Sequence, residues 1–352
     1  MLSLWEPGRR RTLTDSSALE GRVRRWSRRL ATVGAIFIGL TLFLATAPLW
    51  VLIVATLDLI HRSAWARLRC GLYLTWFLVC EAVGLLVALG LFIWPSGSRE
   101  VWLSRHYALQ NYWAGALLDG AVKIFRLKIQ IEGQEAFESG PLLLFMRHAT
   151  LIDTLLPAAL VSRPHGMRLR YVMKRELRID PCLDIVGDRL PNAFIRRGLA
   201  DGSAERLRVI DLTRDLGSKD GVVIYPEGTR FTPERRARLM KKFSEAGESA
   251  RLAKAESFLH VLPPRLGGVM GLMDVAPEAD VVFCAHSGME RLTRLGDLFS
   301  GQVLGAKLRV RAWRVRAQDI PRTEVAREAW LEEEWRKVDR FVEGSDEGRL
   351  DP

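Results

Sequence analysis

The first quarter of the chain is dominated by two long apolar segments. Residues 31–60 contain one proline and one acidic residue, and residues 70–94 carry a single charge, Glu81. A helix that crosses a membrane needs about 20 residues, so each segment is long enough. The short polar link at residues 61–69 therefore predicts a two-helix membrane hairpin. Glu81 is expected to face the other helix of this hairpin or to be protonated.

Two other interpretations of these segments stay open. The hairpin can be re-entrant, bending at Pro48 without crossing the bilayer. A cleaved secretory signal is suggested by the basic start and by the triplet Ala45-Thr46-Ala47. Cleavage is disfavoured because the apolar run continues beyond that triplet. Both forms of the hairpin return the rest of the chain to the side where it began.

Beyond a breaker cluster at residues 95–98, strand and helix patterns alternate along the chain. Apolar or alternating stretches predict strands at residues 127–131, 142–146, 170–173, 222–225, 260–262, 280–284 and 307–316. Helical spacing predicts helices at residues 101–126, 153–161, 203–216, 233–243 and 322–342. This alternation predicts an α/β domain whose largely parallel or mixed sheet is flanked by helices. The chain then divides into a basic segment (1–30), a membrane hairpin (31–94), this domain (99–343) and a tail (344–352).

The charge balance is strongly basic. The chain has 52 Lys and Arg against 41 Asp and Glu, which gives a formal net charge of +11. Such an excess suits an acidic lipid surface, a phosphorylated substrate or a nucleic acid. Because no nucleic-acid-binding motif is present, and because arginines gather just before the first apolar segment, lipid is favoured. These arginines are Arg9, Arg10, Arg11, Arg22, Arg24, Arg25, Arg28 and Arg29.

The arginine cluster also predicts an orientation in the membrane. By the positive-inside rule, the cluster and the α/β domain are expected on the cytoplasmic side of the inner membrane. Arg62, Arg67 and Arg69 in the link count toward the opposite orientation. A second basic stretch, at residues 231–243, is expected to form an amphipathic helix that either lies against the membrane or is solvated.

The cysteines do not indicate a site. Cys70, Cys80, Cys182 and Cys284 lie far apart, without a CxxC pair. This spacing predicts neither a disulfide framework nor a zinc site, and no metal is expected. Reduced or buried thiols are the simpler interpretation.

A histidine and an aspartate five residues apart are the first candidates for chemistry. His148 and Asp153 can meet only if the chain turns between them, because positions i and i+5 diverge on a helix and oppose one another on a strand. The end of an apolar strand at Met146 and the helix start near Asp153 predict such a turn. The carboxylate would then fix the imidazole tautomer and leave the other nitrogen to take a proton.

This pair has no serine or cysteine nucleophile beside it, and Thr150 is interpreted as structural. A base without its own nucleophile fits activation of a substrate hydroxyl that attacks an acyl donor directly. Taken alone, the pair is better explained by a core histidine and a helix cap.

Two further blocks carry arginines suited to an anion. In residues 225–230, Gly228 permits a tight turn and Arg230 supplies a guanidinium fork. Residues 194–198 place Arg196 and Arg197 after a short apolar pair. A plain surface turn would explain either block separately.

Four sequence blocks stand in the order typical of one enzyme family. They are the stretch from Arg147 through Asp153 and residues 194–197, 225–230 and 261–264. In this order they are similar to the NHxxxxD, GxxFIxR, FPEGTR and proline-containing blocks of the glycerolipid acyltransferases, which the 1-acyl-glycerol-3-phosphate acyltransferases typify. Residues 173–177 are also similar to a Lys-x-Glu-Leu segment found between the first two blocks. The resemblance implies a glycerolipid-acyltransferase-like sheet flanked by helices, preceded by the membrane hairpin.

The resemblance also implies roles for individual residues. His148 would be the general base on the acceptor hydroxyl, and Asp153 would orient it. Arg197 and Arg230 are the expected ligands of a phosphate group. The donor would be an acyl thioester of coenzyme A or of acyl carrier protein, with no other cofactor. The full set of substrate-binding residues implied by the blocks is Lys174, Arg196, Arg197, Glu227, Gly228, Thr229 and Arg230.

The resemblance leaves the acceptor open within one class. The first expectation is the lysophospholipid 1-acyl-glycerol-3-phosphate, which would give phosphatidate. Residues 262–268 are also similar to the lysophospholipid-remodelling branch, so another headgroup, an amine or a glycolipid stays open. A membrane-tethered lipid-binding protein without turnover is the alternative from another class, and the intact His148 and Asp153 argue against it.

Three positions depart from the family pattern. Arg147 stands where Asn is usual, Tyr225 where Phe is usual, and Arg196 where an acid is frequent. Arg147 is expected to lower the pKa of His148 or to contact the donor. The other histidines, His286 among them, are expected to be structural or solvated.

Overall fold

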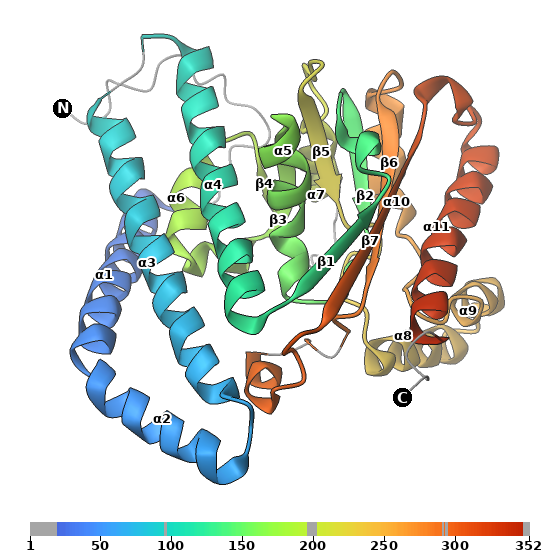
Figure 1. Ribbon diagram of the computed structural model, residues 1–352. Helices are drawn as coiled ribbons and strands as arrows, with labels where there is room; N and C mark the ends of the chain where they lie inside the picture. The colour runs from blue at the N-terminus through green and yellow to red at the C-terminus, as the bar shows by residue number, and fades with distance from the viewer. Residues whose placement is uncertain (1–19, 95–96, 196–202, 291, 293–294, 348–352) are drawn as a thin grey trace.

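The computed structural model describes residues 20–94, 97–195, 203–290, 292 and 295–347. The amino-terminal region forms three helices rather than the two of a simple hairpin (Figure 1): α1 (Arg22–Ala45), α2 (Ala47–His61) and α3 (Ala66–Ile93). The chain bends at Thr46, because Pro48 in the first turn of α2 has no N–H with which to continue α1. This bend lies where the re-entrant interpretation places one.

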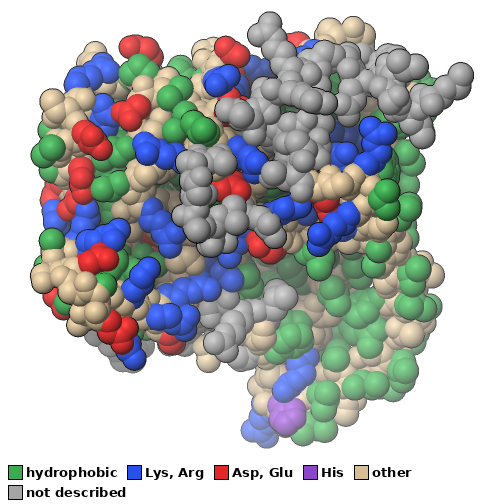
Figure 2. All heavy atoms as spheres, turned by 180° about the vertical axis from the view of Figure 1, so that it is seen from behind, with side chains coloured by type: hydrophobic (Ala, Val, Ile, Leu, Met, Phe, Trp, Pro, Cys, Tyr) green, Lys and Arg blue, Asp and Glu red, His purple; other side chains and the backbone are tan. Residues whose placement is uncertain are grey.

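Helices α1 and α3 are long and apolar enough to cross a membrane, by length and composition. The 15 residues of α2 are fewer than a crossing needs. Figure 2 shows apolar side chains gathered over this helical region, beside a body whose surface is mixed and charged. The exposed large apolar residues of α1–α3 include Trp26, Ile38, Leu42, Leu52, Leu86, Leu89, Phe92 and Trp94.

The rest of the chain is an α/β domain, as the alternating pattern predicts. Its sheet has seven strands in the order β1-β7-β6-β2-β5-β3-β4. Strands β2 to β6 run parallel to one another, whereas β7 is antiparallel to β6 and carries β1 at the edge. The strands are β1 (Lys128–Glu132), β2 (Leu142–Met146), β3 (Arg168–Lys174), β4 (Ala193–Ile195), β5 (Asp220–Ile224), β6 (Asp280–Ser287) and β7 (Lys307–Val315). The sheet and its flanking helices confirm the predicted fold class.

Helices cover both faces of this sheet, with α3 and α4 on one side and α11 on the other (Figure 1). Strand β2 is central and buried along its whole length, because its side chains alternate between the two faces. Leu142 and Leu144 pack toward α4, and Leu143 and Phe145 pack toward α10 and α11. The α-helices of the domain are α4 (Arg99–Phe125), α5 (Arg163–His165), α6 (Pro181–Arg189), α7 (Ser203–Asp211), α8 (Pro233–Glu245), α9 (Ser249–Glu256), α10 (Leu266–Val275) and α11 (Glu324–Glu347).

One predicted strand and one predicted helix are wrong, and several observed elements were not predicted. The strand expected at residues 260–262 is irregular backbone, because its N–H groups bind carboxylates instead of a neighbouring strand: His260 donates to Asp339 and Leu262 to Glu227. The helix expected at residues 153–161 is a 3-10 turn (η3, Ile152–Thr154) followed by a π-helix (η4, Pro157–Ser162). Strand β4 and helices α6, α9 and α10 were not predicted, because they are short or lack clear periodicity.

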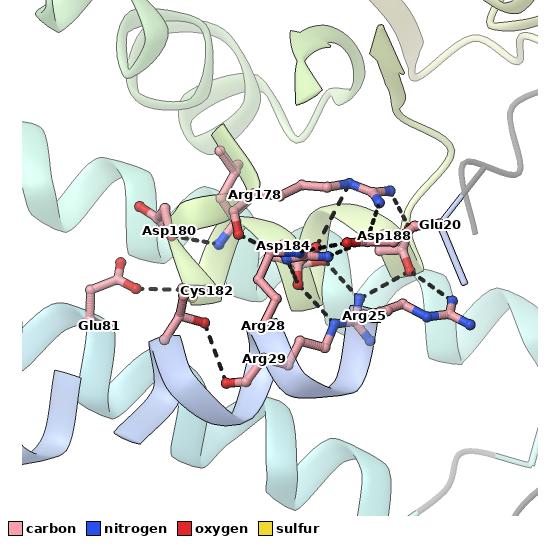
Figure 3. Close-up of polar contacts among 12 residues, drawn as sticks. Glu20, Arg25, Arg28, Arg29, Glu81, Arg178, Asp180, Cys182, Asp184 and Asp188 are labelled. Carbon is pink, nitrogen blue, oxygen red and sulfur yellow. Dashed lines mark hydrogen bonds and ion pairs between the residues drawn. The ribbon is translucent and has the colours of Figure 1, made fainter. Parts of the chain in front are cut away.

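Ion pairs fasten α1 to α6 (Figure 3). Arg28 lies 2.7 Å from Glu20 and 2.6 Å from Asp184. Arg29 lies 2.8 Å from Asp184 and 3.1 Å from Asp188. The expectation that these arginines face an anionic leaflet is therefore wrong for Arg28 and Arg29, because the acidic side chains of the domain already neutralise them.

Glu81 is also held by the domain and not by the hairpin. Its side chain is fully buried; it accepts a hydrogen bond from Trp113 Nε1 of α4 at 2.8 Å and one from the Cys182 N–H of α6 at 3.2 Å. The expectation that Glu81 faces the other hairpin helix is wrong. A polar group buried in apolar surroundings needs such partners, and α4 and α6 provide them.

Candidate active site

The turn after β2 brings His148 and Asp153 together. Strand β2 ends at Met146, and His148 Nδ1 lies 3.1 Å from Asp153 Oδ2. The same carboxylate oxygen accepts hydrogen bonds from the N–H groups of Ala149 at 2.6 Å and Thr150 at 2.8 Å. The Thr150 hydroxyl donates to the other oxygen. These bonds close the turn that a contact between residues five apart requires.

The electrostatics of the pair favour a charged carboxylate. Asp153 is fully buried, and burial by itself raises its pKa. The neighbouring His286 and the hydrogen bond with His148 outweigh that effect and hold the pKa of Asp153 well below its usual range. The Asp153 carboxylate favours the tautomer in which His148 Nδ1 carries the proton and donates it in a hydrogen bond. The Nε2 lone pair is then left to accept a proton. The His148 side chain is 14% exposed, so a substrate can reach it.

Tyr225 packs against the imidazole. The ring centres of His148 and Tyr225 are 4.5 Å apart, and the Tyr225 hydroxyl donates to the Asp153 carbonyl oxygen at 3.0 Å. A phenylalanine at this position would supply the ring but not the hydrogen bond. The tyrosine therefore links the end of β5 to the turn that carries Asp153.

Glu227 lies beneath the turn and does not open toward a substrate. Its carboxylate accepts the His148 N–H at 2.8 Å on one oxygen and the Leu262 N–H at 2.9 Å on the other. Burial raises the pKa of Glu227 to about 8, although these two hydrogen bonds act in the opposite direction. The side chain thus joins three segments of chain, which the sequence alone did not indicate.

The following residues form a tight turn at the same edge of the sheet. Gly228 has a φ of +68°, and a Cβ there would lie 2.7 Å from Arg265 Cδ. The positive φ favours glycine, and a Cβ at this position would also have to displace the flexible side chain of Arg265. The Phe231 N–H donates to the His148 carbonyl oxygen at 2.6 Å, which ties this turn to the turn between His148 and Asp153. Thr229 and Arg230 are half-buried.

The predicted substrate residues converge only in part. Because β2, β3 and β5 are parallel, their carboxyl ends meet at one edge of the sheet, where His148, Lys174 and Arg230 follow them. Lys174 is exposed at the end of β3. Arg196 and Arg197 follow β4 and lie outside the described residues. Within the described ranges, no group of three or more His, Cys, Asp or Glu is arranged to hold a metal ion.

Arg147 points away from His148. The residue is fully buried, with its guanidinium bound to the His286 carbonyl oxygen at 2.7 Å, the His260 carbonyl oxygen at 3.1 Å and Glu290 Oε1 at 2.9 Å. The expectation that Arg147 contacts the donor is wrong, because a buried guanidinium must be paired and these groups occupy it.

His286 is the residue of this region that sequence reasoning missed. It is fully buried at the end of β6; its Nε2 lies 3.0 Å from the Arg147 carbonyl oxygen and 3.4 Å from Asp153 Oδ1. The pairing of β2 with β6, in which Met146 aligns with Cys284, brings it there. A lone histidine near a strand end gives no local signal of such a contact.

Comparison with known proteins identifies the domain. A family model described as Acyltransferase matches residues 128–265. The chain carries an acyltransferase-family domain. The fold also matches the crystal structure of the 1-acyl-sn-glycerophosphate (LPA) acyltransferase PlsC from Thermotoga maritima, with a TM-score of 0.52 and 15% sequence identity. That match covers 80% of this chain and 98% of the PlsC chain. No curated protein sequence matches significantly.

The matched range of the acyltransferase domain contains His148, Asp153 and the turn of residues 225–230. It ends before His286 and Glu290, which contact the catalytic turn from β6 and the loop after it. Some contacts of the turn between His148 and Asp153 therefore come from outside the matched segment.

Proposed function

We propose that this protein transfers a fatty acyl group from a thioester donor to the hydroxyl of a lysophospholipid. The observation that carries the proposal is the His148–Asp153 pair of an acyltransferase-family domain, next to a turn that ends in Arg230. We infer acyl-coenzyme A or acyl carrier protein as the donor and 1-acyl-glycerol-3-phosphate as the first acceptor to test. The PlsC likeness supports the fold and makes this acceptor a reasonable choice.

The surroundings of the pair favour direct attack by the acceptor over a covalent acyl-enzyme. The Thr150 hydroxyl already donates to Asp153. The nearby Cys284 is buried in β6, and burial raises the pKa of its thiol to about 12. A thiol with so high a pKa is a poor nucleophile at neutral pH. The reacting oxygen is therefore expected to belong to the substrate.

The proposed reaction needs only one proton acceptor. His148 Nε2 removes the proton of the acceptor hydroxyl as the oxygen attacks the thioester carbonyl carbon. The tetrahedral intermediate then expels the thiolate as the C–S bond breaks, and the His148 imidazolium returns the proton to the sulfur. Asp153 stabilises the imidazolium between these two steps, and an anion of such low pKa stays charged throughout.

Binding of the acceptor is assigned to cations at the same edge of the sheet. Arg230 is the described candidate for the phosphate, and Arg197 is a second candidate from the sequence. Glu227, with both carboxylate oxygens bound to backbone N–H groups, is assigned to holding the turn instead of contacting the acceptor. The apolar helices α1–α3 would keep the domain at the membrane that supplies the lipid. We place the active site at the cytoplasmic leaflet, on the basis of the arginine cluster.

The proposal is tested by acyl transfer with purified protein in detergent. Labelled acyl-coenzyme A or acyl carrier protein is offered with lysophosphatidate, lysophosphatidylcholine, lysophosphatidylethanolamine and glycerol-3-phosphate in turn. We expect product with lysophosphatidate, loss of at least about 100-fold in His148→Ala, and normal rates in His165→Gln. Selective product with another headgroup would move the acceptor to the remodelling class. Absence of product with every acceptor and both donors would contradict the proposal.

A further inference from the structure

His286 and Arg147 bind each other reciprocally across the gap between β6 and the catalytic turn. The Arg147 guanidinium donates to the His286 carbonyl oxygen at 2.7 Å, and His286 Nε2 lies 3.0 Å from the Arg147 carbonyl oxygen. Both residues are fully buried. The peptide that precedes His148 is therefore fixed by β6 as well as by its own strand.

The same imidazole nitrogen faces the carboxylate of Asp153. Nε2 of His286 lies 3.4 Å from Asp153 Oδ1, while His148 binds Oδ2. Since both neighbours of Nε2 are acceptors, this nitrogen carries the proton in the neutral ring. The other ring nitrogen, Nδ1, is buried and makes no hydrogen bond with any residue that the structure describes. The two oxygens of Asp153 thus face two different imidazoles.

Arg147 is itself held by a charge. Glu290 Oε1 lies 2.9 Å from the Arg147 guanidinium, and Glu290 Oε2 accepts the Gly288 N–H at 2.8 Å. Burial raises the pKa of Glu290, but Arg147 outweighs it, so the pKa is lowered and the pair stays charged. Two charged residues contact His286 directly, namely Arg147 and Asp153. Glu290 lies behind Arg147, and the titratable groups beyond Asp153 are His148, Glu227 and Cys284.

We propose that His286 is a positioning residue for the acyl-transfer reaction, held by Arg147 and acting on His148 through Asp153 and the backbone of the catalytic turn. Its Nε2–H donates to the Arg147 carbonyl oxygen and faces the carboxylate to which His148 is bound. The imidazole of His148 thereby keeps both its orientation and its affinity for a proton. This inference rests on the proposed roles of His148 and Asp153.

The test compares two amides at this position. In His286→Gln the amide nitrogen reaches the place of Nε2, whereas in His286→Asn it reaches only the place of Nδ1. Both changes bury a neutral polar group, so a general loss of stability affects them alike. We expect kcat to fall at least about tenfold in His286→Asn, with KM for the acceptor within about twofold, and to stay within about threefold of wild type in His286→Gln. His165→Gln is the control outside the site.

A second measurement does not depend on turnover. The titration of His148 is followed by NMR with ¹⁵N-labelled histidine in the full-length protein. Without the Nε2–H of His286, the charge of Asp153 acts more fully on His148. The midpoint of the His148 titration in His286→Asn should therefore move upward by about half a pH unit or more. His286→Gln should restore it.

The inference is overturned if His286→Asn leaves both kcat and the His148 midpoint unchanged, or if the two amides behave alike. If wild-type protein acylates no lysophospholipid but the His148 midpoint still moves as expected, the proposed function fails while the coupling of His286 to His148 stands.

Discussion

Asp153 shows how one buried side chain sets both the shape and the charge of the turn that carries His148. Its oxygens accept from the N–H groups of Ala149 and Thr150, from the Thr150 hydroxyl and from His148. A carboxylate with this many donors remains charged and immobile. The residue therefore supports the turn and, in the proposed reaction, is the counter-charge of the base His148.

Replacement of Asp153 by asparagine should separate these roles. The amide keeps the size of the side chain but removes the charge and turns an NH₂ group toward donors. We expect kcat to fall at least about 100-fold, with a smaller change in acceptor KM, because imidazolium stabilisation is needed mainly in the transition state. Steady-state kinetics on folded protein, verified by thermal unfolding, provides the measurement. Wild-type kcat in Asp153→Asn would show that His148 works without its counter-charge.

Glu227 should make the folded protein less stable as pH rises. Burial raises its folded-state pKa to about 8, above the usual value of an unfolded glutamate. The folded state therefore holds the proton more tightly than the unfolded state, and stability falls as pH rises from about 4.5 through 8. The thermal unfolding temperature of wild type, relative to Glu227→Gln, should decrease between pH 5 and pH 8.5. A constant difference across this range would show that Glu227 is charged at all these pH values.

At the scale of elements, the attachment of α1 to α6 depends on a buried carboxylate. Asp184 is fully buried and lies within ion-pair distance of Arg28 and Arg29 of α1, and of Arg178 at 3.8 Å. Arg178 also stacks over the ring of Phe194 in β4, at 4.5 Å from its centre. The first helix is thus attached to α6 through paired charges. Removal of the Asp184 charge leaves, among the described acidic residues, only Glu20 and Asp188 to pair with Arg28, Arg29 and Arg178.

Asp184→Asn should consequently destabilise the docking of α1. Breaking a buried ion pair costs about 3–5 kcal/mol, whereas an exposed pair contributes about 0–1 kcal/mol. Asp119→Asn, which breaks the exposed pair with Arg163, is the matched control. Denaturant unfolding in a single detergent measures the free energies. Trypsin should also cut α1 faster in Asp184→Asn, because Arg25, Arg28 and Arg29 become accessible. Equal behaviour of the two variants would mean that the buried network does not hold α1.

At the scale of the whole molecule, the face drawn in Figure 2 has one region where apolar side chains gather, beside a body of mixed apolar and charged side chains. The apolar region belongs to α1, α2 and α3, where Trp26 is 56% exposed and Trp94 is 77% exposed. A contiguous apolar surface of this kind is typical of contact with a membrane or a partner. The length and hydropathy of α1 and α3 favour the membrane.

Lipid contact is measurable by fluorescence. In vesicles with brominated acyl chains, tryptophans near the chains are quenched. We expect Trp94→Phe to reduce the quenched part of the emission, since this ring is exposed at the end of α3. Trp330→Phe on α11, whose ring packs against Phe283, should leave the quenched part unchanged. The same loss in both variants would argue against immersion of α3.

The sequence by itself determined the features that depend on neighbours along the chain. The buried strand at residues 142–146, the alternation at residues 307–316 and the second apolar segment follow from local hydrophobic pattern, and the structure confirms them as β2, β7 and α3. The first apolar segment is instead divided between α1 and α2. The turn between His148 and Asp153 was also predictable, because the two residues lie on one short segment that must reverse direction.

Only the tertiary structure decided which distant groups meet. The family resemblance implied that Glu227 lies at the acceptor, and Arg147 was expected to lower the pKa of His148 or to contact the donor. Burial instead gives each side chain hydrogen-bond partners from other segments: Leu262 for Glu227, and Glu290 and His286 for Arg147. The cost of burying an unpaired charge depends on what surrounds it in three dimensions, which no local pattern records. For the same reason, the contact between His286 and Asp153 follows only from the pairing of β6 with β2.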